Sequence, residues 1–420
     1  MTADRGAGDR RVVVTGMGMV TGLGTGTAEF AGSLRAGRSG IGPSDAFDRA
    51  GFAHFNVGEV GRFEAREWFR REDPQRYGRA ARFAVAATRL AVGDAGLGEE
   101  ELRRHRVLVS VGTTDGGTHE IDQLAEARFR TGEVRPATEV ARRTPSERLS
   151  DAVVNELALE DVESVTVPTA CAAGNYAVGQ GLDALRAGEA DVALCGGSDS
   201  LSRKTFAGFY RLGAMAPDVC RPFDTGRQGM IVAEGSGMLV LEPLDAALAR
   251  GARIHAEVLG YGLSCDASHP TAPDRDGVAR AVRAAHRDAG ISGSQVDYIS
   301  AHGTGTKAND LVETAALREV FGQELPPTSA IKSMLGHTLG AASALGAIAC
   351  VLAITEGFLP PTIHHEQTDP QCGVDCVPNV AVPAEPDIVQ NNGMAFGGNN
   401  AVLVLGRYRD PGATHAGEGS

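Results

Sequence analysis

Short runs of apolar and often β-branched residues alternate along the chain with longer, alanine-rich stretches. The short runs predict strands at residues 11–16, 107–112, 164–167, 192–197, 297–302 and 401–406. The longer stretches predict helices at residues 80–95, 171–187, 277–289, 309–320 and 339–356. Because these strands show little polar alternation, we expect them in a sheet that helices cover on both faces. The pattern therefore predicts an α/β protein.

Two of the predicted helices, 171–187 and 339–356, are apolar on nearly every side. A helix of this kind has no polar face to turn toward water, so we expect both helices between layers of the protein. A helix-like segment at residues 243–250 marks the expected boundary between two halves of the chain. We place these halves at residues 1–250 and 251–410.

Two glycine-containing segments are expected outside the regular elements. Residues 16–21 follow the first strand and partly match a dinucleotide-binding fingerprint, but Thr21 stands where that fingerprint needs its third glycine. We therefore expect a tight turn between a strand and a helix there. Residues 411–420 are rich in Gly and Ala and are expected to form a flexible tail.

The composition is that of an ordinary globular protein. The 420 residues are 42% hydrophobic and 22% charged, which is enough to bury a large core. The formal net charge of -13 argues against nucleic acid as a partner, because phosphate binding needs a basic face. The start of the chain lacks the apolar core of a signal peptide, and no uncharged apolar stretch is long enough to cross a bilayer. We therefore expect a cytoplasmic protein that does not enter a membrane.

The seven cysteines are scattered along the chain. In a reducing compartment such thiols stay unpaired rather than forming a disulfide framework. The nearest pair, Cys372 and Cys376, is not followed by a second Cys or His pair at the spacing of a zinc site. No metal site is therefore expected.

Cys171 is the strongest candidate for chemistry. It stands where the apolar run at residues 164–167 gives way to an alanine-rich helix. Unpaired N–H groups and the positive end of the helix dipole at such a position lower the pKa of a thiol and favour the nucleophilic thiolate. The alternative is a small buried thiol, the state that we expect for Cys195, Cys220 and Cys350.

Two histidines occur in glycine-rich settings, His302 in the segment AHGTGT and His337 in the segment IKSMLGH. Taken singly, each could be a core histidine that is hydrogen-bonded to backbone carbonyls. However, a nucleophile and its acid–base partners commonly come from distant segments. The neighbouring glycines permit close approach of a ligand, and the hydroxyls of Thr304 and Thr306 can bind an amide-rich chain. Lys332, one of only three lysines, could keep a nearby group charged or orient a histidine.

Five motifs, spread over most of the chain, resemble those of one family. They are TACAAG at residues 169–174, RPFD at 221–224, HGTGT at 302–306, KSMLGH at 332–337 and AFGG at 395–398. The chain resembles the β-ketoacyl-acyl-carrier-protein synthases, the condensing enzymes of fatty acid and polyketide synthesis, in their elongating form with one cysteine and two histidines. The similarity runs from residue 12 to residue 400.

This resemblance implies a thiolase fold, in which two similar βαβαβαββ halves form a five-layered α-β-α-β-α sandwich, normally within a dimer. It also implies a decarboxylating Claisen condensation of an acyl chain with a malonyl group, both carried on the phosphopantetheine of an acyl carrier protein. The product is a 3-oxoacyl thioester that is two carbons longer. No metal or redox cofactor takes part, because the loss of carbon dioxide drives the reaction.

The resemblance assigns roles to individual residues. Cys171 accepts the acyl chain as a thioester, and His302 and His337 then drive decarboxylation of the malonyl group and stabilise the enolate. Lys332 belongs to the same catalytic set. The backbone N–H groups of Cys171 and Phe396 hold the oxyanion that forms during condensation, a type of site that contributes about 3 kcal/mol per donor.

Substrate binding is assigned in the same way. Thr304 and Thr306 hydrogen-bond the phosphopantetheine arm, and Phe396 gates the acyl pocket. The position that resembles an apolar wall of this pocket holds Asp115 instead. A carboxylate that faces a fatty chain is costly unless it is paired or hydrated. Our hypothesis is therefore that the pocket takes a short, polar or unsaturated chain.

The surroundings of Lys332 depart from the family pattern. A glutamate that is common on the helix after the second histidine, where it can pair with the lysine, is replaced by Gly346. The partner of Lys332 is therefore open, with Glu313 or Asp310 as hypothetical substitutes.

Two alternative functions stay open beside a condensing enzyme of a specialised polyketide or polyene pathway. One is a ketosynthase-fold acyltransferase that works without decarboxylation, against which the two retained histidines argue. The other is the non-catalytic partner subunit that sets chain length in ketosynthase heterodimers, against which Cys171 argues. The dimer could be a homodimer or a heterodimer with a chain-length-factor-like homologue.

An acyl carrier protein is the expected partner. Carrier proteins of this family are acidic, which suits docking on local arginine patches despite the negative total charge. The candidate arginines are Arg70, Arg71, Arg76, Arg203 and Arg211.

Overall fold

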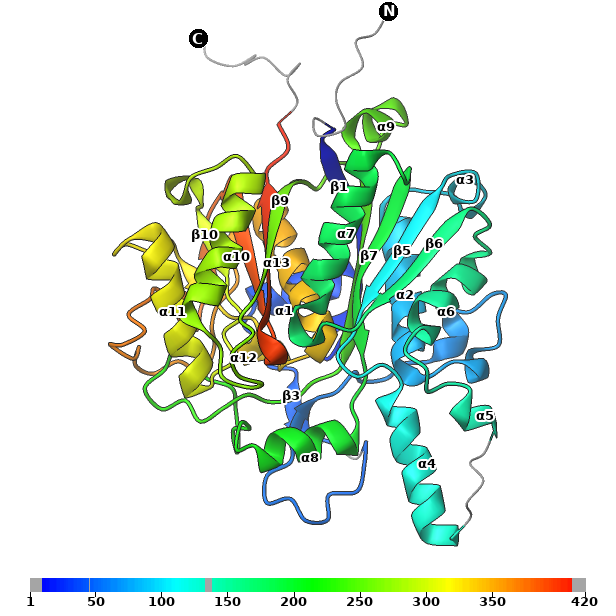
Figure 1. Ribbon diagram of the computed structural model, residues 1–420, viewed down its shortest axis with the longest axis horizontal. Helices are drawn as coiled ribbons and strands as arrows, with labels where there is room; N and C mark the ends of the chain where they lie inside the picture. The colour runs from blue at the N-terminus through cyan, green and yellow to red at the C-terminus, as the bar shows by residue number, and fades with distance from the viewer. Residues whose placement is uncertain (1–9, 45, 133–137, 410–420) are drawn as a thin grey trace, which may run out of the picture.

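The computed structural model describes residues 10–44, 46–132 and 138–409, so the predicted tail at 411–420 lies outside the described residues. Two halves follow one another, each with the same order of main elements (Figure 1). The N-terminal half consists of β1 (Val12–Thr21), α2 (Arg79–Asp94), β5 (Val107–Gly112), α6 (Arg148–Leu157), β6 (Val162–Val167), α7 (Ala173–Ala187), β7 (Val192–Asp199) and β8 (Gly235–Pro243). The C-terminal half consists of β9 (Ala256–Cys265), α10 (Arg275–Asp288), β10 (Tyr298–Ser300), α11 (Lys307–Phe321), β11 (Thr328–Ser329), α13 (Ala342–Glu356), β14 (Ile388–Met394) and β15 (Asn399–Gly406).

Shorter elements connect and decorate these halves. The helical ones are α1 (Thr27–Arg35), α3 (Glu99–Leu102), α4 (Thr118–Thr131), α5 (Thr138–Ala141), α8 (Arg203–Arg211), α9 (Leu244–Ala249) and α12 (Lys332–Leu335). The 3-10 turns are η1 (Ala65–Glu67), η2 (Pro74–Arg76), η3 (Ala170–Ala172), η4 (Gly293–Gln295), η5 (Leu339–Ala341) and η6 (Phe396–Gly398). The short strands are β2 (Gly24–Thr25), β3 (Ile41–Pro43), β4 (Asn56–Gly58), β12 (Phe358–Leu359) and β13 (Val382–Pro383).

Each half contributes five strands to the main path of one sheet, in the order β6-β5-β7-β8-β1 and then β9-β15-β14-β10-β11, and the short β2 pairs with β1 beside this path. In each half the last strand runs antiparallel to its neighbours, β8 between β7 and β1, and β15 between β14 and β9. The halves join where β1 pairs antiparallel with β9, from Val12 opposite Val258 to Val14 opposite Ala256. The predicted strands at 107–112 and 192–197 are buried along their whole length, as the lack of polar alternation indicated.

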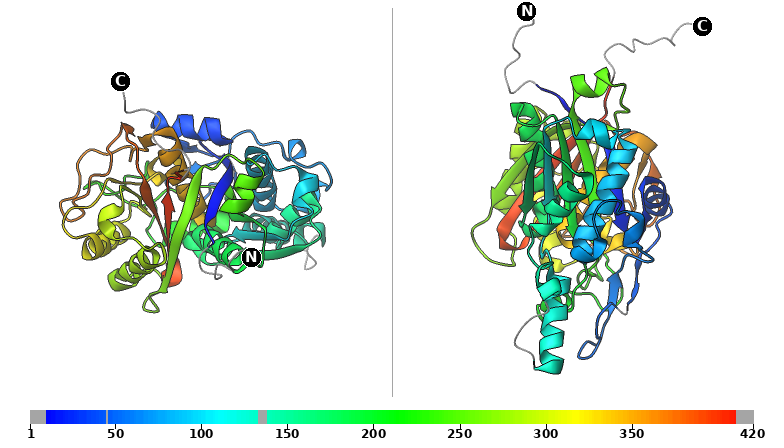
Figure 2. Two further views of the ribbon diagram at one scale, coloured as in Figure 1. Left: turned by 90° about the horizontal axis from the view of Figure 1, so that it is seen from above. Right: turned by 90° about the vertical axis from the view of Figure 1, so that its right-hand side faces the viewer.

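Helices separate and cover the two parts of the sheet. The central layer consists of α7 and α13, which contact each other and strands of both halves (Figure 2). The outer layers are α2 with α6 on the N-terminal half and α10 with α11 on the C-terminal half. The result is the five-layered thiolase fold that the resemblance implies. Contrary to the expectation that no apolar stretch is long enough to cross a bilayer, the helix Leu339–Glu356 is so by length and composition, but 89% of it is buried inside the protein.

One local prediction is wrong. Residues 16–21 do not form a turn between a strand and a helix, because they continue β1 as far as Thr21. The glycines in this segment serve helix packing instead. A Cβ atom on Gly16 would lie 2.1 Å from the Ala91 carbonyl oxygen, and one on Gly18 would lie 2.0 Å from that of Ala87. They therefore let α2 lie directly against the strand.

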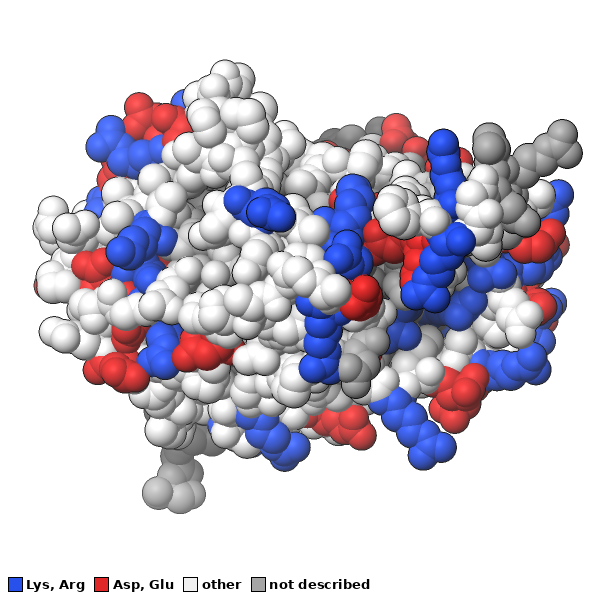
Figure 3. Space-filling view, turned by 90° about the horizontal axis from the view of Figure 1, so that it is seen from below, with Lys and Arg blue, Asp and Glu red and all other residues white. Residues whose placement is uncertain are grey.

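The lower face of the molecule carries α4 and α8, and α4 projects away from the rest of the chain (Figures 1 and 2). Figure 3 views this face from below. Lysine and arginine side chains gather across its middle and right, with acidic side chains interspersed among them, and a wide uncharged area lies to the left of centre. A local basic region therefore exists on a chain whose net charge is negative.

Candidate active site

Cys171 lies in the 3-10 turn that leads from β6 into α7. The preceding residue, Ala170, has a φ of 52°, in the left-handed region that costs a non-glycine residue energy. This sharp turn places the thiol at the start of a buried helix, where Cys171 is 5% exposed. The predicted transition from strand to helix at this cysteine is therefore present.

A narrow cavity of about 70 Å³ joins the residues that the motifs singled out. Its lining includes Cys171, His302, His337, Thr304, Thr306 and Phe396. These residues come from the N-terminal half, from the loop after β10, from the loop after α12 and from η6. Tertiary structure thus brings together four segments that lie far apart in the sequence.

The sequence led us to expect that the helix terminus lowers the pKa of Cys171, but in the buried site this pKa is raised. Burial raises the pKa of the Cys171 thiol to about 12, although the Lys332 ammonium lowers it. The desolvation of a thiolate inside the protein outweighs the favourable charge. Cys171 is therefore a neutral thiol at neutral pH, and a base must take its proton as it reacts.

His337 has a defined tautomer. The backbone N–H of Leu339 donates a hydrogen bond of 3.1 Å to His337 Nδ1, so this nitrogen carries no proton. Burial, with Lys332 adding to it, lowers the pKa of His337 well below its ordinary value, and the ring is neutral. Its single proton must lie on Nε2. The ring therefore offers one hydrogen-bond donor, on the nitrogen opposite the backbone contact.

His302 faces His337 across the cavity, with ring centroids 5.5 Å apart and planes at 82°. Burial lowers the pKa of His302 well below its ordinary value, so this ring is also neutral. Among the described residues, no hydrogen bond fixes the tautomer of its ring. Lys332 instead holds the backbone, since its Nζ donates a 2.7 Å hydrogen bond to the His302 carbonyl oxygen. The expectation that Lys332 orients a histidine is met through the main chain.

Glu313, rather than a direct ion pair, balances the Lys332 charge. Among the described residues Lys332 forms no ion pair, but burial lowers its pKa while the carboxylates of Glu313 and, more weakly, Asp310 raise it. Glu313 is fully buried and accepts hydrogen bonds from the backbone N–H groups of His302 at 2.7 Å and Gly303 at 2.8 Å. Glu313 therefore acts as a substitute partner of Lys332 only indirectly. The carboxylate binds the N–H group of His302, and the ammonium binds the carbonyl of the same residue.

Gly346 is explained by its neighbour on β14. A Cβ atom on Gly346 would lie 2.4 Å from Asn391 Oδ1, so no larger residue fits there. The Asn391 amide occupies this space and donates to Asn175 Oδ1 at 2.8 Å and to the Ser343 carbonyl at 2.7 Å. An amide cluster between the two central helices thus stands where the resemblance led us to expect a carboxylate.

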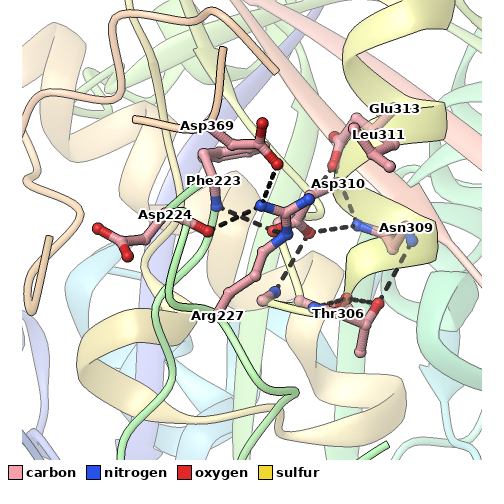
Figure 4. Close-up of polar contacts among 12 residues, drawn as sticks. Phe223, Asp224, Arg227, Thr306, Asn309, Asp310, Leu311, Glu313 and Asp369 are labelled. Atoms are coloured by element: carbon pink, nitrogen blue, oxygen red, sulfur yellow. Dashed lines mark hydrogen bonds and ion pairs between the residues drawn. The ribbon is translucent and has the colours of Figure 1, made fainter. Parts of the chain in front are cut away.

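A second buried network supports the loop that carries Thr304 and Thr306 (Figure 4). Asp310 accepts hydrogen bonds from the backbone N–H groups of Gly305 at 3.2 Å and Phe223 at 2.9 Å. The Arg227 guanidinium lies 3.5 Å from Asp310 and 2.7 Å from Asp369. The RPFD motif, which contains Phe223, therefore fixes the loop rather than touching substrate. The two threonine hydroxyls remain at the cavity, 2.9 Å from each other.

Phe396 stands at the mouth of the cavity. Its ring is 38% exposed and packs on Phe209 of α8, with centroids 5.6 Å apart. The next two residues, Gly397 and Gly398, have φ values of 84° and 79°, which glycine adopts without strain. A partly exposed ring on a short glycine turn can move with little cost, as a gate requires.

Asp115 does not line this cavity. Its carboxylate accepts a hydrogen bond from Thr205 and lies 3.6 Å from the Lys204 ammonium, and it raises the pKa of Cys171 only as a minor cause. Asp115 is therefore paired, and the desolvation cost that we expected for an unpaired carboxylate does not arise. A contact between Asp115 and an acyl chain stays a hypothesis.

Asp199 is a site residue that sequence reasoning missed. It ends β7, is fully buried, and accepts hydrogen bonds from the backbone N–H groups of Thr114 at 2.8 Å and Gly340 at 2.6 Å. Burial raises the pKa of the Asp199 carboxyl to about 7. An acidic residue that ends a fully apolar strand was the available signal. Its bonds tie the N-terminal half to the turn that follows His337.

The candidate docking arginines fall into two groups. Arg203 and Arg211 are the end residues of α8, the helix that contributes Phe209 to the cavity mouth. Arg70 and Arg76 instead pair with Glu99 and Glu72, and Arg71 precedes Glu72 in the same segment, away from α8.

Within the described part of the chain, no group of three or more His, Cys, Asp and Glu side chains could hold a metal ion.

Comparison with known proteins gives relatives that span the chain. Residues 9–247 match the N-terminal domain of beta-ketoacyl synthases, and residues 255–366 match their C-terminal domain. The chain is 37% identical to 3-oxoacyl-[acyl-carrier-protein] synthase 2 of Synechocystis sp., over 95% of this chain and 99% of that protein. It is 38% identical to the ketoacyl synthase alpha subunit of the tetracenomycin polyketide synthase of Streptomyces glaucescens, over 96% of this chain and 98% of that protein.

A solved structure is similar along its whole length. The ishigamide ketosynthase/chain length factor superposes with a TM-score of 0.94 and is 57% identical in sequence, covering 95% of this chain and 100% of that chain. Sequence and structure comparisons therefore agree on one family.

Proposed function

This chain belongs to the β-ketoacyl synthase family and is a condensing enzyme, and we propose that Cys171, His302 and His337 carry its chemistry. The reaction joins an acyl chain to a malonyl unit, each delivered as a thioester on an acyl carrier protein. The observation that carries the proposal is the convergence of one thiol and two neutral imidazoles on a single cavity.

Acyl loading begins at Cys171. The sulfur attacks the carbonyl carbon of the incoming thioester while its proton passes to an imidazole of the cavity. The neutral His302 ring can accept this proton, whereas His337 has its Nδ1 occupied by the Leu339 N–H and its Nε2 protonated. The tetrahedral intermediate collapses with release of the pantetheine thiol, which takes up a proton. Backbone N–H groups of Cys171 and Phe396 are our candidates for holding the oxyanion.

Condensation follows in the same cavity. The malonyl carboxylate leaves as carbon dioxide, and its bonding electrons form an enolate. The Nε2 proton of His337 hydrogen-bonds the enolate oxygen, with His302 as the second candidate donor. The enolate carbon then attacks the acyl carbonyl on Cys171, and the sulfur leaves and takes up a proton that solvent supplies through an imidazole of the cavity, which restores the neutral thiol. Thr304 and Thr306 are placed to bind the pantetheine arm during both steps.

The release of carbon dioxide from malonyl-loaded acyl carrier protein, with and without an acyl primer, tests this proposal. A condensing enzyme forms one 3-oxoacyl product for each carbon dioxide released in the presence of primer. An acyltransferase would move the acyl group without carbon dioxide release, and a non-catalytic subunit would not acylate Cys171. Either result, obtained with the chain alone and again in the presence of a chain-length-factor-like protein, would overturn the proposal.

We also propose a specialised polyketide or polyene pathway, supported by the similarity to the two polyketide-type proteins above. Asp115 is paired and does not line the described cavity, so the hypothesis of a short, polar or unsaturated acyl chain rests here on this similarity alone. Measuring elongation across carrier-bound acyl groups tests it, because a preference for long saturated chains would contradict it.

A dimer is the proposed assembly, in a cytoplasmic setting. The edge strand β6 has no strand partner on its outer side in the described chain, and its residues are only partly buried. Phe129 on the projecting helix α4 is 95% exposed. Both features suit a second subunit, either an identical chain or a homologue of the chain-length-factor type. Sedimentation experiments on this chain, alone and co-expressed with a chain-length-factor-like protein, test the assembly. A monomer in both experiments would contradict it.

A further inference from the structure

His286 lies on the outer helix α10, away from the cavity. It is 6% exposed and packs edge-on against Phe321, with ring centroids 5.3 Å apart. Its Nε2 atom lies 2.8 Å from Gln390 Oε1 on β14. An amide oxygen only accepts hydrogen bonds, so His286 Nε2 must carry the proton and donate it.

The hydrogen bond from His286 begins a hydrogen-bond chain of buried side chains, which runs through Gln390 and Asn392 to Glu313 and is called the chain below. Gln390 Nε2 donates to Asn392 Oδ1 at 2.7 Å, and Asn392 Nδ2 donates to Glu313 Oε1 at 3.0 Å. Gln390, Asn392 and Glu313 are each at most 2% exposed. Every hydrogen in the chain therefore points the same way, from His286 toward the Glu313 carboxylate, and bonds aligned in this way strengthen one another.

The chain ends at the backbone of the site. Glu313 receives the Asn392 amide together with the N–H groups of His302 and Gly303. On the other side of the His302 residue, its carbonyl accepts from Lys332. The orientation of Glu313 thus determines where the His302 main chain lies relative to the buried ammonium.

The direction of the chain is fixed at its inner end, because the Glu313 carboxylate only accepts hydrogen bonds and an amide oxygen that faced it would be unfavourable. At the outer end the His286 N–H satisfies the Gln390 oxygen. If position 286 offered no N–H group, this buried oxygen would lose its hydrogen bond, and the Gln390 side chain would shift toward another donor and pull on Asn392 and Glu313. A single imidazole at the outer layer therefore holds the chain in place.

We propose that His286 is a positioning residue for decarboxylation, acting on His302 and Lys332 through Gln390, Asn392 and Glu313. This inference rests on the proposed function of His302. It adds a residue from the outer layer that has no contact with substrate. Three buried polar residues, Gln390, Asn391 and Asn392, in the middle of the central strand β14 are the sequence signal for such a device.

The test compares three variants by carbon dioxide release from malonyl-loaded acyl carrier protein. H286M removes the donor at similar side-chain size, whereas H286Q keeps an N–H group near the position of Nε2. Y298F is the matched control. It removes one buried hydrogen bond, between Tyr298 and Ser329, which lies in the same half of the protein but does not belong to the hydrogen-bond chain.

We expect H286M to lower kcat roughly tenfold with little change in KM, since misplacement of a catalytic group affects the chemical step. H286Q and Y298F should stay within about twofold of the parent enzyme, even where Y298F loses as much thermal stability as H286M. Equal losses of kcat in H286M and H286Q, or in H286M and Y298F, would overturn the inference. A parent enzyme that released no carbon dioxide would instead overturn the proposed function.

Discussion

The N-terminal and C-terminal halves build the start of their central helix in the same way. In each, a residue with left-handed φ, Ala170 at 52° and Leu339 at 54°, opens a 3-10 turn of three residues. Each turn leads into a helix of 15 residues, α7 or α13. The two turns contact each other at the centre of the molecule.

The difference between the halves lies in what this turn carries. The first turn holds Cys171, whereas the equivalent residue of the second is Gly340. A Cβ atom on Gly340 would lie 2.5 Å from the Thr113 main chain, and its N–H donates to Asp199 at 2.6 Å. No nucleophile fits there. The second turn instead donates the Leu339 N–H to His337, so one half supplies the nucleophile and the other orients a hydrogen-bond donor.

The largest expected effect is the loss of the only cavity thiol among the described residues. C171A should lower condensation by roughly 10³-fold or more, because no other group can hold the acyl chain. Its matched control is C350A in the central helix of the other half, a thiol whose pKa burial also raises to about 12 but which does not line the cavity. C350A should retain activity. Product formation measured by mass spectrometry compares the two, and equal losses would contradict the division of roles.

The second effect concerns His337, the hydrogen-bond donor that the second turn orients. H337A removes the Nε2 donor and should lower malonyl decarboxylation about 10²–10³-fold, the loss that follows removal of one oxyanion donor. Acylation of Cys171 should fall less, because His302 remains able to accept a proton. Separate measurements of carbon dioxide release and of the acylated Cys171 peptide distinguish these steps. A larger loss in acylation than in decarboxylation would contradict the assigned role.

A third prediction concerns the protonation of Cys171. Since burial raises the pKa of this thiol to about 12, the thiol is protonated below that pH and the thiolate fraction rises about tenfold with each pH unit. Alkylation of Cys171 by iodoacetamide should therefore keep rising between about pH 6 and about pH 9, whereas a thiol activated by its helix would reach a plateau. Peptide mass spectrometry follows the rate, with the exposed Cys265 as internal reference. A plateau near neutral pH would show that the helix terminus outweighs burial.

A fourth prediction tests the amide cluster that replaces a carboxylate beside Gly346. G346A should lower the free energy of unfolding by about 1–3 kcal/mol, because its methyl group would overlap Asn391 Oδ1. Adding N391A should cost less in the G346A background than in the parent, because the overlap disappears. The control is G32A in α1, where a Cβ atom meets no neighbour within 4 Å. Denaturant unfolding that shows strict additivity would contradict this packing argument.

The smallest effect is expected at the surface around the entrance. R211E, at the end of α8, should raise KM for the acyl carrier protein by about threefold without changing kcat, because surface charges act mainly on encounter. R76E is the comparison, since Arg76 already pairs with Glu72 at 2.8 Å. Steady-state kinetics at low and high salt measure both. A larger rise in KM for R76E than for R211E would indicate that the carrier protein docks away from α8.

The sequence predicted the main elements and singled out Cys171, His302 and His337, which the structure brings to one cavity. Strands such as 107–112 and the two apolar helices follow from local hydrophobic patterns, which depend on residues a few positions apart. Cys171, His302, His337 and Lys332 stand out because of the glycine-rich motifs around them. The segment at 16–21 was mispredicted, because glycines that serve contact with a distant helix look locally like those of a turn.

Tertiary structure alone decided the electrostatics and the partners. The pKa of Cys171 depends on desolvation by residues from both halves, which no local pattern records. Lys332 binds the His302 carbonyl, Gly346 makes room for Asn391, and His286 connects to Glu313, each across more than 20 positions of the chain. A sequence specifies which groups are available, but burial and distance, which only the folded chain sets, determine their charge and their contacts.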